Sequence, residues 1–521
     1  MNESLELPGS WAFAPASDLA EINPRSFCPV PNAILQPVHF VPMSAVTEEF
    51  GGISVEARRP LGEVQKGYTA FLGGDVLFAK ITPCMENGKL AVVPRLQDHI
   101  AYGSTEFHVL RARDTVQPRW LAYFLSQSAF RRLARQNMTG SAGQLRVATT
   151  WLSGTTIPVA PATEQTRIIT KLEELLSDLD AGVAELKTAQ KKLKQYRQSL
   201  LKAAVEGALT AEWRARNKPA ETGVQLLDRI LSERRARWEA KQLNKFKEQG
   251  KTPPKDWQKK YPEPVQPDTT DLPELPEGWV WASGEHLCEF ITKGTTPPKD
   301  LDSGEEKSVP FLRVTNLTDQ GELDLTDEVF VSLKTHQSFL ARSAVYPNDV
   351  LMNIVGPPLG QVSVVPSTFN EWNINQAIAI FRAVEGVLPW FICRYLLSPV
   401  AQRWLKVRSK TTAGQTNLTL EVCRGLPFPL PPQDEQQALL VNLEMAMSSI
   451  VSQGRAIGLA LKQSTAQRQN ILRAAFAGQL VPQDPNDEPA SVLLERIRAE
   501  RAAKASVKKP RGRKTKDTTD A

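Results

Sequence analysis

The residues whose types and order come closest to a catalytic site lie in one acidic loop. Asp300 is followed by Glu305-Glu306-Lys307, an order of acidic residues and a lysine that could hold a divalent metal in a nuclease. The loop belongs to residues 295–308, whose proline, glycine and charged residues predict a solvated connection. We therefore expect no catalysis there.

Other catalytic motifs are incomplete in this sequence. An adenine or cytosine methyltransferase needs an Asn/Asp-Pro-Pro-aromatic loop, and both Gly356-Pro357-Pro358 and Leu430-Pro431-Pro432 lack the acidic or amide residue. No Gly-x-x-x-x-Gly-Lys-Ser/Thr loop is present, so we expect no ATP hydrolysis by this chain. We also predict no metal site and no cofactor site, because the chain has no Cys-x-x-Cys and its histidines lack the spacing of metal ligands; these are His39, His99, His108, His286 and His336.

Basic and amide side chains, many beside glycine- and asparagine-rich turns, remain as candidates for binding DNA. Lysine and arginine would hold phosphates, while asparagine, glutamine and arginine could pair with base edges in the major groove. For each of them an ordinary role in surface solubility stays open. The candidates are Lys66, Lys80, Asn87, Lys89, Arg131, Arg132, Arg135, Gln144 and Arg146 in the first half, and Arg313, Asn316, Lys334, Arg342, Arg403, Lys406, Arg408, Lys410 and Gln415 in the second.

The elements that position these residues occur twice, in the same order. Residues 158–165 align with 429–436, and residues 201–209 align with 472–480, both at an offset of 271 positions. Such repetition predicts a tandem duplication. Further matches join Ala142-Gly143-Gln144 to Ala413-Gly414-Gln415, Leu7-Pro8-Gly9-Ser10-Trp11 to Leu275-Pro276-Glu277-Gly278-Trp279, Gly74-Asp75-Val76-Leu77-Phe78 to Asn348-Asp349-Val350-Leu351-Met352, and Leu226-Leu227 to Leu493-Leu494.

Each half begins with short apolar runs that predict mixed α/β structure and ends in a long helix. The helices carry the three-four spacing of a coiled-coil seam, from Ile168 to Ala204 and from Leu439 to Leu461, after which the second pattern thins before Ile471 and Ala475. Gly207 and Gly478 are placed to end them. Because an exposed apolar seam needs a partner, we expect the two helices to pair antiparallel about a pseudo-two-fold axis. Packing of each helix on its own domain or on another chain stays open.

The predicted fold class is α+β, with two mixed α/β domains joined by two long antiparallel coiled-coil helices. The predicted segments are a first domain at 1–160, a central long helix at 161–212, a basic helical connector at 213–270, a second domain at 271–431, a distal long helix at 432–482, and a tail helix with a basic C-terminal tail at 483–521.

Charge and cysteine usage set limits on the surroundings. The net charge of +6 permits nucleic acid as a partner without establishing it. The five cysteines lie far apart, which is typical of reduced thiols in a cytoplasm, and no apolar run is long enough to predict a membrane span. Two stretches are locally basic, and an ordinary solvated face or tail stays open for each; they are Arg229 to Lys260 and Lys508 to Lys516.

These motifs together resemble the specificity subunits of type I restriction–modification enzymes, over essentially the whole chain. The resemblance rests on the Pro-x-x-Glu-Gln starts at Pro161 and Pro432, the Leu-x-x-Ala-x-x-Gly-x-Leu helix ends at Leu201 and Leu472, and the Leu-Pro-x-x-Trp openings at Leu7 and Leu275. The segment from Gly74 to Lys89 and the tail helix from Leu493 to Lys504 are similar to parts of this family, the latter to a branch with an extended C-terminus. One departure is Leu209-Thr210-Ala211-Glu212-Trp213, which has Leu480-Val481-Pro482 as its counterpart.

The resemblance implies a non-catalytic subunit with two target-recognition domains, each of which reads one half of a split site on double-stranded DNA. It implies two modification subunits that dock on the helices and restriction subunits that join them, with S-adenosylmethionine, ATP and Mg²⁺ held by those partners. The alternatives are a self-sufficient restriction or methylation enzyme and a coiled-coil scaffold with no DNA role. The missing cofactor motifs argue against the first, and two large variable domains argue against the second.

Overall fold

A computed structural model describes most of the chain. The described residues are 7–24, 35–50, 52–54, 57–95, 100–113, 115–141, 143–270, 272–298, 306–412 and 415–507. Cys28, His99, Asp300, Glu305 and the basic tail from Lys508 to Lys516 lie outside them, so the acidic loop is not described as a unit. The chain divides into two compact units, unit 1 with residues 1–187 and 458–521 and unit 2 with residues 188–457.

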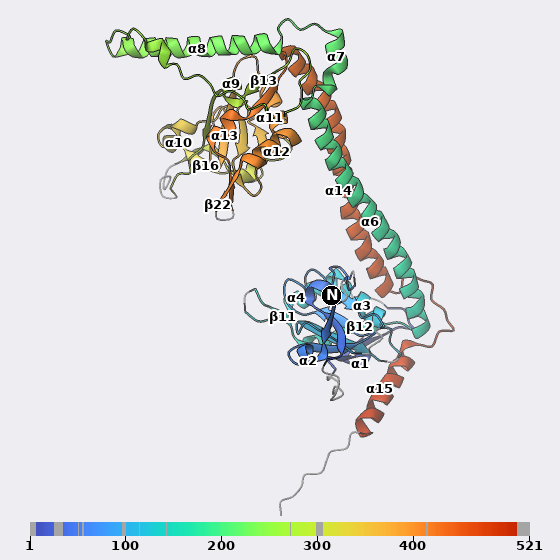
Figure 1. The fold of residues 1–521 in the computed structure, drawn as a ribbon. Coiled ribbons are helices and arrows are strands. Elements are labelled where there is room, and N and C mark those ends of the chain that lie inside the picture. The colour runs from blue at the N-terminus through green and yellow to red at the C-terminus, as the bar shows by residue number, and fades with distance from the viewer. Residues whose placement is uncertain are drawn as a thin grey trace, which may run out of the picture. The chain divides into compact units, whose positions relative to one another are not determined.

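Unit 1 holds the first domain (Figure 1). This domain contains two four-stranded sheets. One sheet has the order β2-β9-β6-β7 and the other β4-β3-β8-β5, in which β3 and β8 run parallel. All four residues of β6 are buried, as expected for a strand with neighbours on both sides. The elements are β1 (Ala12–Pro15), α1 (Ala16–Leu19), β2 (Ala20–Ile22), β3 (Pro37–Val41), η1 (Met43–Ala45), β4 (Ala57–Pro60), α2 (Leu61–Val64), β5 (Thr69–Leu72), β6 (Val76–Ala79), β7 (Leu90–Val92), β8 (Ile100–Gly103), β9 (Phe107–Ala112), α3 (Pro118–Ser126), α4 (Ser128–Gln136), β10 (Met138–Thr139), β11 (Arg146–Val147), α5 (Thr149–Gly154) and β12 (Thr156–Val159).

Unit 2 holds the second domain and repeats this plan. Its main sheet has the order β14-β21-β17-β19, and β17 is a fully buried central strand like β6. The elements are β13 (Val280–Ser283), α9 (Gly284–Leu287), β14 (Cys288–Lys293), β15 (Lys307–Leu312), η4 (Val314–Asn316), β16 (Phe330–Ser332), α10 (Leu333–Gln337), η5 (Ala341–Ser343), β17 (Val350–Asn353), β18 (Val355–Gly356), β19 (Val362–Val364), β20 (Asn373–Ile374), β21 (Ile378–Ala383), α11 (Pro389–Leu396), α12 (Pro399–Arg408), β22 (Lys410–Thr412), β23 (Gln415–Asn417), α13 (Leu420–Gly425) and β24 (Pro427–Leu430).

The same buried ion pair precedes the central strand in both domains. Asp75 accepts two hydrogen bonds from the Arg111 guanidinium, at 2.9 and 2.7 Å. Asp349 accepts the equivalent pair from Arg382, at 2.7 and 2.6 Å. Each aspartate also accepts a backbone N–H three residues before it. The Asp-Val-Leu motif found in both halves therefore marks one structural device, used twice.

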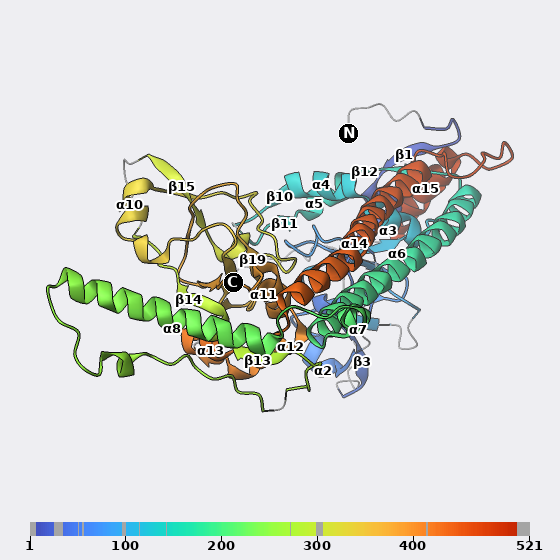
Figure 2. The ribbon, with the colours of Figure 1, turned by 90° about the horizontal axis from the view of Figure 1, so that it is seen from above.

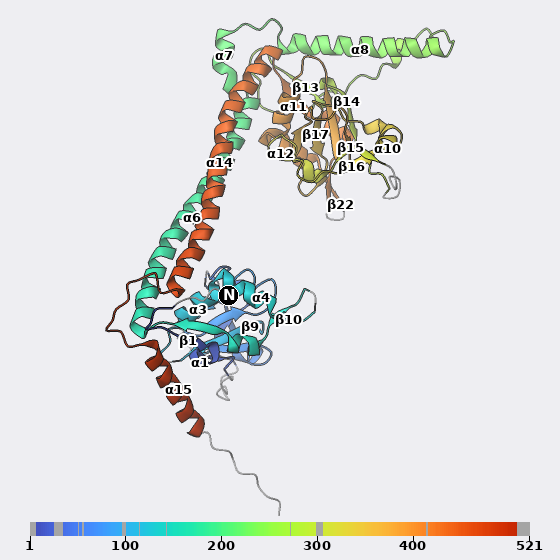
Figure 3. The same ribbon diagram turned by 180° about the vertical axis from the view of Figure 1, so that it is seen from behind.

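The long helices are α6 (Ala162–Val205) and α14 (Gln433–Phe476), each of 44 residues. In unit 1 the start of α6 lies beside the end of α14 (Figure 3), and Asp180 of α6 forms an ion pair with Arg468 of α14. In unit 2 the end of α6 lies beside the earlier part of α14, with Leu193 against Gly454. The contact at the higher number on α6 falls at the lower number on α14, so the two helices are antiparallel. The predicted fold class, α+β with two long helices, is confirmed.

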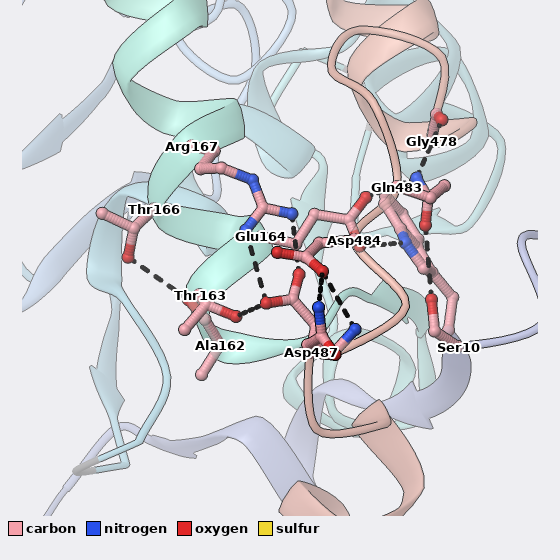
Figure 4. Close-up of polar contacts among 12 residues, drawn as sticks. Ser10, Ala162, Thr163, Glu164, Thr166, Arg167, Gly478, Gln483, Asp484 and Asp487 are labelled. Carbon is pink, nitrogen blue, oxygen red and sulfur yellow. Dashed lines mark hydrogen bonds and ion pairs between the residues drawn. The ribbon is translucent and has the colours of Figure 1, made fainter.

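Three repeated motifs meet at a buried carboxylate in unit 1 (Figure 4). Glu164, from the Pro-x-x-Glu-Gln motif, accepts hydrogen bonds from Trp11 Nε1 at 3.0 Å and Gln483 Nε2 at 2.6 Å. Trp11 belongs to the Leu-Pro-x-x-Trp opening. Gly478, in the left-handed conformation at the end of the α14 segment, lies against Pro8 and Trp11. The end of the second repeat is therefore fixed to the start of the first.

Unit 2 contains the matching junction with different polar partners. Glu435 accepts hydrogen bonds from Trp279 Nε1 at 2.9 Å and Thr210 Oγ1 at 2.7 Å, and it forms an ion pair with Arg214. Thr210 and Arg214 belong to the segment that departs from the repeat, and they take the place of Gln483. The sequence difference between the two repeats at this point therefore changes which side chains donate hydrogen bonds to the buried glutamate.

Further helices flank both domains. They are η2 (Ala208–Thr210), α7 (Ala211–Arg216), α8 (Gly223–Glu248) and η3 (Trp257–Lys260) in unit 2, and α15 (Ala490–Val507) in unit 1. Leu226 of α8 and Leu493 of α15 are buried at matching positions, and the rest of α8 runs out beyond β13 (Figure 2). Among the described helices, none combines the length and apolar character that a membrane crossing requires.

Candidate nucleic-acid interface

In unit 1, the loop that leaves the central strand β6 carries three of the candidate residues. Loop 80–89 contains Lys80, Asn87 and Lys89, and it includes the cis peptide bond between Thr82 and Pro83. Asn87 is exposed and donates to Glu48 at 2.8 Å, whereas Lys89 is half-buried and donates to the Met43 carbonyl at 3.2 Å. The loop is therefore held by hydrogen bonds to the segment that follows β3.

A hairpin made by β10 and β11 is bonded to this loop. Thr82 N donates to the Leu145 carbonyl at 3.0 Å, and Leu145 N donates to Thr82 Oγ1 at 3.2 Å. The hairpin brings the exposed Gln144 and the half-buried Arg146 beside the loop. Arg146 forms a two-point ion pair with Glu106, and this contact lowers the pKa of the Glu106 carboxyl.

Helix α4 supplies the three remaining cations of the unit 1 site. Arg131 donates to the Glu86 carbonyl at 3.1 Å and lies so close to Gly88 that a side chain there would collide with its guanidinium. Arg135 is ion-paired with the Glu86 carboxylate, and Arg132 is exposed. Burial lowers the pKa of Arg131. Because a partly buried cation gains from a nearby anion, Arg131 is suited to meet phosphate, and Arg132 adds an exposed positive charge on the same helix.

Unit 2 assembles the same three parts at the same place in the fold. The loop that leaves β17 includes cis peptide bonds before Pro357 and Pro358, and its strand β18 pairs with β23 of the hairpin β22–β23. Helix α12 completes the site, because Gln402 Nε2 donates to the Gly360 carbonyl at 2.9 Å. The hairpin lies at the end of unit 2 remote from α8 (Figures 1 and 3).

An open hollow of about 500 Å³ lies between these parts in unit 2. Arg403 and Lys406 on α12 are exposed at its edge, and Lys410 is exposed on the hairpin. Arg408 lies over the Trp404 ring, 4.1 Å from its centroid, and pairs with Asp268 at 2.8 Å. The lining residues are Pro357, Leu359, Gln402, Arg403, Leu405, Lys406, Ser409 and Thr416. Such a mixed apolar and basic hollow can accept a base edge or a sugar beside a phosphate.

Thirteen of the eighteen candidates belong to these two assemblies, and five lie elsewhere. Gln415 is placed as the first residue of β23, opposite Thr412. Asn316 is buried, and its side chain holds its own loop by donating to the Asp324 carbonyl at 2.8 Å. Arg313 pairs with Asp327 in that loop. The candidates outside the assemblies are Lys66, Arg313, Asn316, Lys334 and Arg342, of which Lys66, Lys334 and Arg342 are exposed. Contact of any of the eighteen with DNA remains a prediction.

The assembly also depends on residues that the sequence did not single out. Asn353 is fully buried, donates to the Pro358 carbonyl and accepts a hydrogen bond from Gln361 N at 2.9 Å. Gln402 holds the loop after β17 to α12 through the Gly360 carbonyl, and Thr82 holds loop 80–89 to the β10–β11 hairpin through Leu145. A signal was available only for Thr82, because it lies in the Lys80 to Lys89 segment similar to the family; Asn353 and Gln402 are defined by contacts distant in sequence. Among the described residues, no three His, Cys, Asp or Glu side chains gather as metal ligands would.

Comparison with known proteins places the chain among recognition subunits of one kind. No family model matches the sequence. The chain is 30% identical over 371 residues to the type I restriction enzyme EcoBI specificity subunit of Escherichia coli, which covers 69% of this chain and 67% of that subunit. It is 26% identical over 485 residues to the EcoEI specificity subunit of Escherichia coli, covering 84% and 78%. It is 30% identical over 329 residues to the EcoAI specificity subunit of the same species, covering 55% and 52%.

A solved structure has the same fold. It comes from work on complex assembly and conformational transition of the type I restriction–modification system, and it matches with a TM-score of 0.65 at 20% identity. The match covers 91% of this chain and 99% of the other.

Proposed function

Since the chain belongs to the specificity subunits of type I restriction enzymes, the non-catalytic DNA-recognition subunits of those complexes, we propose that it reads a split target, one half with each unit. The observation that carries this proposal is the repeated assembly of loop, hairpin and basic helix. One such surface would suffice for a single contiguous site. Two copies on equivalent domains are what a target in two halves requires.

Within each assembly, the loop and hairpin would enter the groove while the helix holds the backbone. In unit 2, Arg403 and Lys406 are exposed cations on α12 and are suited to phosphates. The loop after β17 and the hairpin supply the side chains that would face base edges. In unit 1 the corresponding roles fall to α4, to loop 80–89 and to the hairpin that bears Gln144.

We further propose that partner subunits perform the chemistry. Two modification subunits would dock on α6 and α14 and methylate adenine within the target, and restriction subunits would join them and cut DNA with ATP. S-adenosylmethionine, ATP and Mg²⁺ would be bound by these partners, in the cytoplasm. The exposed apolar side chains on α14, such as Met445 and Leu459, support a docking role for the helices.

The test of the split target is an exchange of one domain. Residues 1–160 are replaced by the corresponding domain of another member of the family, and the hybrid is expressed with the modification subunits. The methylated motif should change in one half and keep the other. A hybrid that is active and changes both halves would contradict the proposal.

A further inference from the structure

Arg197 differs from the other cations along the C-terminal part of α6. It is 6% exposed, whereas Lys191, Lys192 and Lys194 are exposed. Its guanidinium reaches Asp319 of the second domain, with Nη1 3.2 Å from Asp319 Oδ2 and Nη2 donating to the Asp319 carbonyl. Burial lowers the pKa of Arg197, although Asp319 opposes this shift. The long helix α6 therefore places a buried positive charge, that of Arg197, against the second domain, although burying a charge is energetically unfavourable.

The segment that Arg197 contacts is a short strap, residues 317–323. Its ends are joined by an isolated antiparallel bridge between Leu317 and Leu323. A second guanidinium, from Arg394 on α11, donates to the Gln320 carbonyl at 2.5 Å. Two arginines therefore hold consecutive carbonyls of the strap, one from the long helix and one from the domain itself.

The strap is hydrogen-bonded in turn to β19, the strand that follows the loop after β17, which the proposed function places against DNA. Val362 N donates to the Thr318 carbonyl at 3.2 Å, and Val364 N donates to the Gly321 carbonyl at 2.8 Å. Ser363 Oγ donates to the Glu322 carbonyl at 2.9 Å. A continuous series of contacts therefore runs from α6 through the strap and β19 to the loop that ends at Gln361.

We propose that Arg197 is a positioning residue for reading the second half of the target. Arg197 itself would not touch DNA; it fixes the strap, and through β19 the loop after β17, against the long helix. The inference rests on the proposed function and deepens it by assigning specificity to a helix residue. A loop that is already fixed loses less conformational freedom on binding and holds its base contacts in one geometry.

Unit 1 uses another connection at the matching place. Arg468 lies 271 residues after Arg197, the offset of the repeat, yet it is ion-paired with Asp180 of α6. There Val46 and Ile53 form a bridge like that between the ends of the strap, and Phe50 N donates directly to the Gly88 carbonyl of loop 80–89 at 3.2 Å. Arg197 should therefore govern the second half of the target alone.

The experiment measures binding by the subunit assembled with its modification subunits. The probes are a duplex with the motif methylated in wild-type cells and duplexes with single base changes in either half; the exchange of residues 1–160 shows which half belongs to which domain. Arg197→Met removes both contacts, and Arg197→Lys keeps the charge without the two-point geometry. Asp319→Asn weakens the contact from the strap side, where the Asp319 side chain is 64% exposed and folding should tolerate the change. Lys194→Met is the matched control on the same helix.

With Arg197→Met, affinity for the intact motif should fall about tenfold. Discrimination against changes in the second half should shrink, and discrimination in the first half should stay at the wild-type level. Affinity and second-half discrimination of Arg197→Lys should lie between those of Arg197→Met and the wild type. Asp319→Asn should lower both quantities, and Lys194→Met should match the wild type in both. Circular dichroism of each variant checks the fold.

Three results would overturn the proposal. Arg197→Met and Asp319→Asn complexes that read the second half as the wild type does would remove the positioning role. Equal loss in both halves would make Arg197 a general stabiliser. A wild-type complex that binds no split motif would overturn the proposed function together with this inference.

Discussion

The two buried glutamates at the helix starts provide a matched test of how the repeats are joined. Glu435 faces the Arg214 guanidinium, whereas Glu164 receives neutral donors from Trp11 and Gln483. Glu435→Gln leaves Arg214, whose side chain is only 23% exposed, without its carboxylate. The loss should be about 2–3 kcal/mol of stability, the usual scale for a charge-assisted contact that is mostly buried.

Glu164→Gln should cost about 1 kcal/mol or less, because an amide oxygen still accepts from Trp11 and Gln483 can rotate its own amide to meet the new NH₂ group. Urea unfolding of the full chain at neutral pH, followed by tryptophan fluorescence, gives the difference in midpoints. Equal destabilisation by the two substitutions, or greater loss with Glu164→Gln, would refute the assignment of Arg214 as the distinguishing contact.

The burial of Glu164 predicts that the stability of the protein depends on pH. Burial raises the pKa of Glu164 above its ordinary value of 4.5, so the folded protein binds this proton more tightly than the unfolded chain. The contribution of Glu164 to stability is then complete below pH 4.5 and falls as the pH rises through the raised value. The stability of the wild type relative to Glu164→Gln should fall over that window, and a rise would contradict the burial argument.

Three further predictions concern the helix ends, the binding of phosphates and the chemistry. Gly207→Ala should destabilise the protein by about 1–3 kcal/mol, because the φ of Gly207 is +70° and a Cβ there would lie 2.5 Å from Pro276 Cγ. Gly182→Ala, in the open interior of α6, should instead stabilise it by about 0.5–1 kcal/mol. Chemical denaturation that ranks the two variants in the opposite order would contradict this prediction. Arg403→Gln with Lys406→Gln should lower the slope of log affinity against log salt by about 0.9 for each phosphate that the protein no longer neutralises, and an unchanged slope would place DNA elsewhere. The purified chain alone should neither methylate nor cleave DNA in assays with S-adenosylmethionine, ATP and Mg²⁺. Turnover by the purified chain that Asp300→Ala abolishes would show instead that the acidic loop is catalytic.

The sequence predicted the features of the fold that depend on local pattern. The apolar spacing from Ile168 predicted the long helix, and the glycines at 207 and 478 take the left-handed conformation expected at its end. Repetition of short motifs predicted two equivalent domains. The reason for three of those motifs could not be read from one half alone, because Glu164, Trp11 and Gly478 meet only when both repeats are folded together.

The candidate site could be predicted by residue type but not by arrangement. Arg146 and Arg135 were reasonable phosphate ligands by sequence, yet each pairs with a glutamate, and Asn316 is buried within its own loop. Such pairings join residues far apart in the chain, so no local pattern reports them. For the same reason Asn353 and Gln402, which hold the loop after β17, and Arg197, which holds the strap, carried no signal in sequence.

We propose that this chain alone decides which DNA sequence its partner subunits modify. Methylome sequencing of cells with and without the gene, with modification subunits present in both, tests it directly. Cells without the gene should lose one asymmetric, adenine-methylated motif whose two specified parts are separated by unspecified bases. An unchanged methylome in cells with active partners would contradict it.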